Sequence, residues 1–260
     1  MTPVLVFDIE TIPDVAGLRT LNNLGVEVSD AQIAAQAFAA RKEKTGSEFL
    51  QHHLHRVAAI SCVFRSSEGF QVRSLGSVED GEAKLVQDFF KIIDKYTPQI
   101  VSWNGGGFDL PVLHYRALVH GISAPRYWEM GEDDREFKWN NYLSRYHTRH
   151  LDLMDLLALY TGRANAPLDD LAKLCGFPGK LGMDGSKVWD AYQQGQLSEI
   201  RAYCETDVVN TYLMFARFQL LRGAWHKAQY EDEVALVRNS LAALPDTHWQ
   251  EYLAAWPVQF

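Results

Sequence analysis

The apolar run at residues 3–8 (PVLVFD) most strongly constrains the fold of this chain. Its β-branched and aromatic residues are typical of a strand buried on both faces. Asp8 and Glu10 lie two residues apart at the end of this run. Residues i and i+2 of an extended strand point to the same side, so both carboxylates should emerge together. Most D-x-E pairs are solvated strand ends, so this pair indicates chemistry only if other groups join it.

The remaining pattern predicts strands and helices in alternation. Strands are expected at 57–64, 70–75 and 99–103, with residues 66–69 as a hairpin turn between the first two. Residues 151–160 open with another short strand or helix. Helices are expected at 29–44, 79–96, 108–120, 168–175, 188–192 and 198–221, with one or two more in 225–260. This order predicts α/β layers.

The bulk composition favours one domain. With 260 residues and 47% hydrophobic content, the chain can bury a large core. We expect the main domain at residues 1–222, and residues 223–260 as a C-terminal helical extension of it. After residue 220 only about forty residues remain, fewer than a typical domain. A second large domain is therefore not expected here.

Charge and cysteine usage narrow the class of protein. The formal net charge of −8 disfavours a protein that binds nucleic acid passively through its phosphates. It neither favours nor disfavours an enzyme that holds divalent metals between carboxylates, because bound metals invert the local charge. No stretch approaches the roughly 18 apolar residues of a membrane helix, and the N-terminus lacks the basic region of a signal peptide. Cys62, Cys175 and Cys204 are far apart. They suggest reduced thiols of a cytoplasmic protein, in core or incidental positions.

Two further segments carry carboxylates. In WNGGGFDLPVL (103–113) a strand leads through three glycines into a helix, and Asp109 lies in its first turn, where a carboxylate is electrostatically favoured. No P-loop signature accompanies the glycines. Tyr203 and Asp207 are four residues apart on a predicted helix and therefore share one face. Each feature alone is most often structural.

The three segments together resemble the DEDD superfamily of 3′→5′ exonucleases. The matching motifs are D-x-E-T (Asp8, Glu10, Thr11), N-x-x-x-F-D (Asn104, Phe108, Asp109) and Y-x-x-x-D (Tyr203, Asp207). The histidine subclass would need His at the position of Ala202, so Tyr203 indicates the tyrosine (DEDDy) subclass. WNGGGFDLPVL, HRVAAISCVF and LDDLAKLCGFPGK are also similar to predicted exonucleases related to the proofreading domain of family B DNA polymerases. This resemblance covers roughly residues 3–220. A polymerase domain is not expected in the chain, so any proofreading would be done in trans with a DNA polymerase or repair partner that the sequence does not identify.

The resemblance implies an RNase H-like fold, with a mixed five-stranded sheet flanked by helices. It also implies hydrolysis of single-stranded nucleic acid from the 3′ end, with DNA favoured, using two divalent ions, Mg²⁺ or Mn²⁺. In that picture Asp8 bridges the ions, Glu10 and Asp207 complete the water-activating ion, and Asp109 supports the other through its waters. Tyr203 would orient the attacking water. The 3′-terminal nucleotide would be held by Thr11, Ile12, Asn104 and Phe108.

Several alternatives stay open. The same site would serve an exoribonuclease or oligoribonuclease, and a catalytically silent nucleic-acid-binding module is a third possibility. The basic and aromatic segment 135–150 would either hold a single strand or cover the core. Asp152 could lie near the site. His52, His53 and His55 are expected at the surface or in a partner contact.

Overall fold

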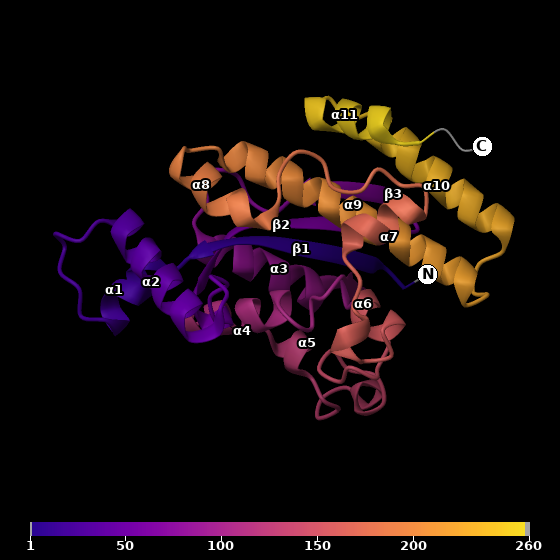
Figure 1. Cartoon of the computed structure of the whole chain (residues 1–260). Helices are drawn as coiled ribbons and strands as arrows, with labels where there is room; N and C mark the ends of the chain where they lie inside the picture. The colour runs from indigo at the N-terminus through magenta and orange to yellow at the C-terminus, as the bar shows by residue number, and fades with distance from the viewer. Residues whose placement is uncertain (1, 258–260) are drawn as a thin grey trace.

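The computed structural model describes residues 2–257, which form a five-stranded sheet between two layers of helices (Figure 1). The strands are β1 (Val4–Pro13), β2 (His55–Ser66), β3 (Gly69–Ser74), β4 (Gln99–Ser102) and β5 (His150–Asp152). The helices are α1 (Val15–Leu21), α2 (Asp30–Thr45), α3 (Glu82–Tyr96), α4 (Asp109–His120), α5 (Pro125–Trp128), α6 (Leu153–Leu157), α7 (Leu168–Leu174), α8 (Val188–Gln193), α9 (Leu197–Leu221), α10 (Lys227–Ala242) and α11 (Thr247–Ala255).

The sheet has the order β3-β2-β1-β4-β5. The central strand β1 pairs antiparallel with β2 and parallel with β4, and β4 pairs parallel with β5. β4 meets β1 only along Val4–Val6. The carboxyl-terminal half of β1 therefore extends beyond its parallel neighbour, and Asp8 and Glu10 lie on this extension.

Side chains alternate along β1 between two separate cores. Leu5 and Phe7 belong to the core under α3 and α4, whereas Val4 and Val6 belong to the core shared with α9, α10 and α11. Since parity is conserved along a strand, Asp8 is directed toward α9. Figure 1 shows the same division, with α9 lying along one face of the sheet and α3 and α4 on the other, while α1 and α2 project from one end.

The expected RNase H-like α/β fold is confirmed, with differences in detail. β1 runs on to Pro13 instead of ending at residue 8, and residues 151–160 contain both the end of a strand and a short helix, α6. Two helices follow α9, and they pack on it within one core. The short helices α1 and α5 were not predicted from the periodicity. Among residues 2–257, no helix has the length and apolar character needed to span a membrane.

Candidate active site

The first two carboxylates come from β1. The pairing register of β1 with β2 shifts between Glu10 and Thr11, and such bulges redirect side chains, often next to active sites. Glu10 is buried and Asp8 is half-buried. The Cys204 thiol of α9 donates to the Asp8 backbone oxygen at 3.4 Å and to its Oδ2 at 3.6 Å. The end of β1 therefore lies against α9.

Asp109 joins this strand end from α4. It is the first residue of that helix, and its Oδ1 accepts from the Ile9 backbone N–H at 3.1 Å. The turn before the helix is held by Asp152, whose carboxylate accepts from the backbone N–H groups of Asn104 and Gly106, both at 2.9 Å. Asn104 has a φ of 67°, which Asn tolerates better than most residues. Asp152 therefore lies near the site, where it binds the loop that leads into Asp109.

Tyr203 and Asp207 share one face of α9, as their spacing predicts, and Lys180 lies between them. The Lys180 Nζ is 2.6 Å from Asp207 Oδ2 and donates to the Tyr203 hydroxyl at 2.5 Å. The Asp207 and Tyr203 side chains are both buried. Burial lowers the pKa of Lys180, but the charge of Asp207 and its hydrogen bond outweigh this and raise it overall. Lys180 is therefore an ammonium ion inside an acidic cluster.

The four carboxylates repel one another. Burial, followed by the charges of Asp109 and Asp207, raises the pKa of Asp8 well above its ordinary value. Burial and then the charges of Asp8 and Asp207 do the same to the pKa of Glu10. Burial raises the pKa of Asp109 to about 7, and the charge of Asp152 adds to this. The pKa of Asp207 is also raised by burial, although Lys180 opposes it. Such grouped, perturbed acids are typical of functional sites.

The donor set suits a hard divalent cation. Asp8, Glu10 and Cys204 each offer a ligand atom within 4.8 Å of the others. Burial and the nearby carboxylates raise the pKa of the Cys204 thiol well above its usual value, so it stays protonated and leaves the carboxylate oxygens as ligands. One buried oxygen of Asp207, Oδ1, has no hydrogen-bond partner. A buried acceptor without a donor is costly, and a cation would satisfy it.

A cavity of about 820 Å³ adjoins Glu10. Among the predicted substrate residues, Thr11, Ile12 and Phe108 line it. Asn104 does not: it lines a second hollow of about 550 Å³, together with Asp152. The first cavity is also lined by side chains that the sequence reasoning did not assign to the substrate, among them Phe38, Phe49, His55 and Trp189. Ile12 packs in the small core under α8 and α9.

The interpretation of the three histidines as surface residues was wrong for His55. It is buried, its Nδ1 pairs with the Thr11 hydroxyl at 2.9 Å, and its Nε2 pairs with the Leu50 carbonyl at 3.2 Å. Burial lowers its pKa to about 4, so it is neutral at pH 7. His52 Nε2 pairs with the Gly107 carbonyl at 2.9 Å. Both histidines therefore hydrogen-bond to loops near the cavity, His55 to the loop at Leu50 and His52 to the loop at Gly107.

The basic and aromatic segment 135–150 was expected either to hold a single strand or to cover the core, and its aromatic residues differ in this respect. Phe137 and Tyr142 are buried in the core on the α3 side. The guanidinium groups of Arg126 and Arg149 lie 4.2 Å and 3.9 Å from the centre of the Phe137 ring. These aromatics cover the core and are inaccessible to bases. Trp139 remains 83% exposed.

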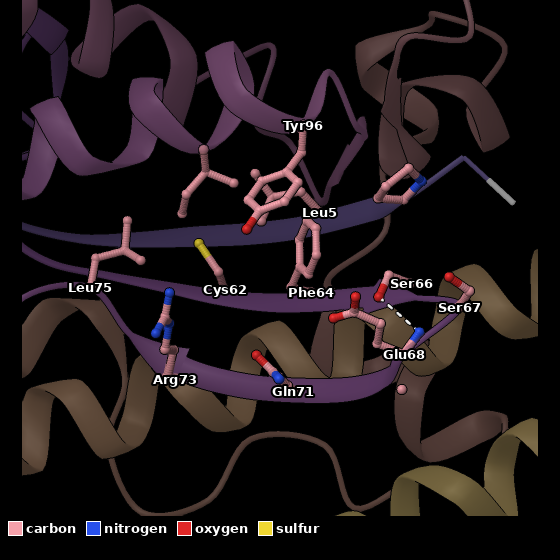
Figure 2. Close-up of a pocket in the computed structure, with 13 residues that line it drawn as sticks. Leu5, Cys62, Phe64, Ser66, Ser67, Glu68, Gln71, Arg73, Leu75 and Tyr96 are labelled. Atoms are coloured by element: carbon pink, nitrogen blue, oxygen red, sulfur yellow. Dashed lines mark hydrogen bonds between the residues drawn. The ribbon is translucent and has the colours of Figure 1, made fainter.

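A further hollow, of about 340 Å³, lies on the face of the sheet opposite to the face that carries Asp8 (Figure 2). Figure 2 shows Leu5, Cys62 and Phe64 at its floor beside Tyr96. Because Leu5 has the opposite parity to Asp8, the sheet separates this hollow from the carboxylate cluster. It is not part of the candidate site.

Lys180 and Cys204 were missed by sequence reasoning. Lys180 was included only as the last residue of the segment LDDLAKLCGFPGK and was given no role. Cys204 was assigned to a core or incidental position, and the structure buries it in the core. A signal existed for Cys204, because it lies three residues before Asp207 and shares its helix face. The resemblance of LDDLAKLCGFPGK gave Lys180 no role, because its place beside Asp207 and Tyr203 depends on the loop after α7.

The fold and site define a nuclease-type α/β domain, and comparison with known proteins identifies the family. Residues 47–256 match the family of predicted 3′-5′ exonucleases related to the exonuclease domain of PolB, and the chain belongs to this family. The match begins after β1, the strand that carries Asp8 and Glu10. This strand contacts the matched part through the hydrogen bonds of Ile9 with Asp109 and of Asp8 with Cys204.

Two similar proteins are DNA polymerases. The chain is 25% identical to a DNA polymerase of Archaeoglobus fulgidus over 136 residues, covering 51% of this chain and 17% of that protein. Its fold resembles the family B DNA polymerase of the hyperthermophilic archaeon Pyrobaculum calidifontis, with a TM-score of 0.51, 17% identity, and coverage of 98% of this chain and 27% of the other. The chain thus spans about a quarter or less of these relatives.

Proposed function

We propose that this protein is a metal-dependent 3′→5′ exonuclease that hydrolyses single-stranded nucleic acid, with DNA favoured. The observation that carries the proposal is that Asp8, Glu10, Asp109 and Asp207, from three separate elements, are buried or half-buried close enough to raise one another's pKa, with Lys180 Nζ 2.6 Å from Asp207. Burying mutually repelling acids destabilises a fold. A cluster that costs stability and lies beside a cavity is best explained by function.

Two divalent ions, Mg²⁺ or Mn²⁺, would be held by Asp8, Glu10, Asp109 and Asp207. Carboxylate oxygens are the ligands that both ions prefer. The chemistry that such a pair supplies when bound is activation of a water and stabilisation of the leaving oxygen. The buried Asp207 Oδ1, which has no hydrogen-bond partner, supports a cation at this site.

The remaining side chains would position and stabilise the reactants. Burial, and then the charge of Asp207, raises the pKa of the Tyr203 phenol. It stays protonated, so it would orient the attacking water by a hydrogen bond instead of removing its proton. The Lys180 ammonium would stabilise negative charge on the phosphate. The water oxygen would bond to phosphorus and release a proton to solvent, the bond from phosphorus to the 3′ oxygen would break with that oxygen taking up a proton from solvent, and a nucleoside 5′-monophosphate would leave.

The cavity beside Glu10 would receive the 3′-terminal nucleotide. Thr11, Ile12 and Phe108 line it, and Phe49 adds an aromatic ring 5.3 Å from that of Phe108. Bases stack on such rings without sequence preference. Asn104, in the neighbouring hollow, would contact the next nucleotide. DNA is favoured because the similar proteins are DNA polymerases, and a polymerase or repair partner acting in trans is part of the proposal.

Digestion of labelled oligonucleotides tests this function. Single-stranded DNA and RNA of one sequence, labelled at the 5′ end, are incubated with Mg²⁺, Mn²⁺ or EDTA. The proteins are the wild type, Asp8→Ala, and Asp170→Ala as a matched control, because Asp170 is exposed. We expect a ladder of fragments shortened from the 3′ end with the wild type and the control. EDTA and Asp8→Ala should both abolish it, and a ladder that survives either treatment refutes the metal site.

The same experiment separates the alternatives. Faster degradation of RNA than of DNA would identify an exoribonuclease with the same site. If neither polymer is cut although both are retained in a gel-shift assay, the protein is a catalytically silent binding module.

A further inference from the structure

Gly179, the residue before Lys180, is hydrogen-bonded to the buried side-chain amide of Asn210 in α9. The Asn210 side chain is fully buried, donates to the Gly179 carbonyl at 2.8 Å and accepts from its N–H at 3.3 Å. Gly179 has a φ of 73°, in the region that favours glycine. On the other side, the Lys180 N–H donates to Asp169 at 2.7 Å. The backbone that carries Lys180 is therefore fixed from both directions.

A third group completes this arrangement from the C-terminal helix. The Tyr252 hydroxyl of α11 donates to Asn210 Oδ1 at 2.7 Å, and the Tyr252 side chain is fully buried. Burial raises the pKa of this phenol well above its usual value, so it remains a donor. Because a phenol donor must face the amide oxygen, Tyr252 helps to fix the orientation in which Asn210 Oδ1 accepts from the Gly179 N–H while Asn210 Nδ2 donates to the Gly179 carbonyl.

A second contact joins the same helix region to the loop. The ring of Trp256, the residue after α11, meets that of Phe177 edge-on, with centroids 6.0 Å apart. Both side chains are buried. The end of the chain that the structure describes is thus packed on the loop that precedes Lys180, in addition to the hydrogen bonds through Asn210.

We propose that Tyr252 is a positioning residue for Lys180, acting through Asn210 and Gly179. This rests on the proposed function, in which the Lys180 ammonium between Asp207 and Tyr203 stabilises charge during phosphodiester cleavage. Helix α11 and Trp256 would then be part of the catalytic unit. Catalysis is sensitive to displacements of about 1 Å, so loosening Gly179 would lower the rate of the chemical step without removing any group that contacts the substrate.

Tyr252→Phe removes only the hydroxyl and keeps the ring. Tyr142→Phe is the matched control: its hydroxyl is also buried and donates to a carbonyl, that of Pro98, at 2.6 Å, in the core on the α3 side. Hydrogen–deuterium exchange of the full chain, read by mass spectrometry, should be faster over residues 179–181 in Tyr252→Phe and unchanged there in the control. Equal exchange in both variants refutes the contact as a restraint on Gly179.

Kinetics on single-stranded DNA test the consequence. We expect kcat to fall about tenfold in Tyr252→Phe, as when a supporting partner of an active-site ligand is lost, with KM within about twofold of the wild type. In a Lys180→Met background, Tyr252→Phe should cause no further loss, because coupled residues are not additive. Faster exchange with unchanged kcat, or additive losses, would overturn the positioning role. If the wild type cuts no polymer, the proposed function falls, while exchange still decides whether Tyr252 restrains Gly179.

Discussion

In the absence of metal, Asp109→Asn should stabilise the folded protein at pH 8 while it impairs exonuclease activity. Burial raises the pKa of Asp109 from 3.8 to about 7. Between these two values the folded state holds a proton that the unfolded state has released. The free energy of unfolding therefore falls as the pH rises through this window, and the full loss is reached above about pH 7.

The magnitude follows from the size of the shift. About three pKa units, at about 1.4 kcal/mol per unit, set an upper limit of about 4 kcal/mol for the cost of the ionised Asp109 above pH 7. Asparagine carries no charge and keeps an oxygen to accept from the Ile9 N–H. Its amide group introduces two N–H donors, and leaving them without hydrogen-bond partners would cost about 1–3 kcal/mol of stability. We therefore expect a net gain of about 1–3 kcal/mol.

Thermal unfolding in EDTA between pH 4 and pH 8 measures this effect. The gain corresponds to a rise in Tm of about 2–4 °C per kcal/mol for a chain of this size. Asp133→Asn, the same exchange at an exposed position, is the control. The stability difference between Asp109→Asn and the wild type should grow from pH 4 to pH 7 and then level off. A difference that does not depend on pH, or a variant less stable than the wild type at pH 8, would refute the electrostatic reasoning. Added Mg²⁺ should narrow the gap, because metal binding favours the ionised carboxylate.

Two other substitutions probe the cavity and the fold. Phe49→Ala should raise KM for single-stranded DNA about tenfold with kcat little changed, since base stacking contributes about 1–3 kcal/mol. Trp128, which is 50% exposed against 54% for Phe49, lies outside this cavity, so Trp128→Ala should leave KM unchanged. An equal effect of the two substitutions on KM would show that Phe49 does not bind the substrate. Arg116→Leu should cost about 3–5 kcal/mol in urea unfolding, because its buried guanidinium pairs with Glu82 and Asp14, both at 2.6 Å. A cost below about 1 kcal/mol would contradict this.

Local periodicity was sufficient for much of the fold and for the predicted carboxylates. The direction of a side chain relative to its own element depends on spacing alone, so Asp8 with Glu10 and Tyr203 with Asp207 could be paired from the sequence. Helix ends also depend on local sequence: Ser29 forms the capping box of α2, and Gly46 ends that helix in the left-handed conformation. Strand β1 was predicted too short because its polar end, Glu10 to Pro13, does not read as a buried strand.

The contacts between elements were decided by the tertiary structure. Asp109 and Ile9 are 100 residues apart, Cys204 and Asp8 are 196 apart, and the two ends of the Lys180–Tyr203 hydrogen bond are 23 apart on different elements. Periodicity orients each side chain, but which faces meet depends on how the whole chain buries its apolar surface. Sequence alone therefore determined which acids were candidates. Only the packing of α7 and α11 on α9, and of α9 on β1, brought Lys180 beside Asp207 and placed Tyr252 against Asn210, which binds the Gly179 backbone.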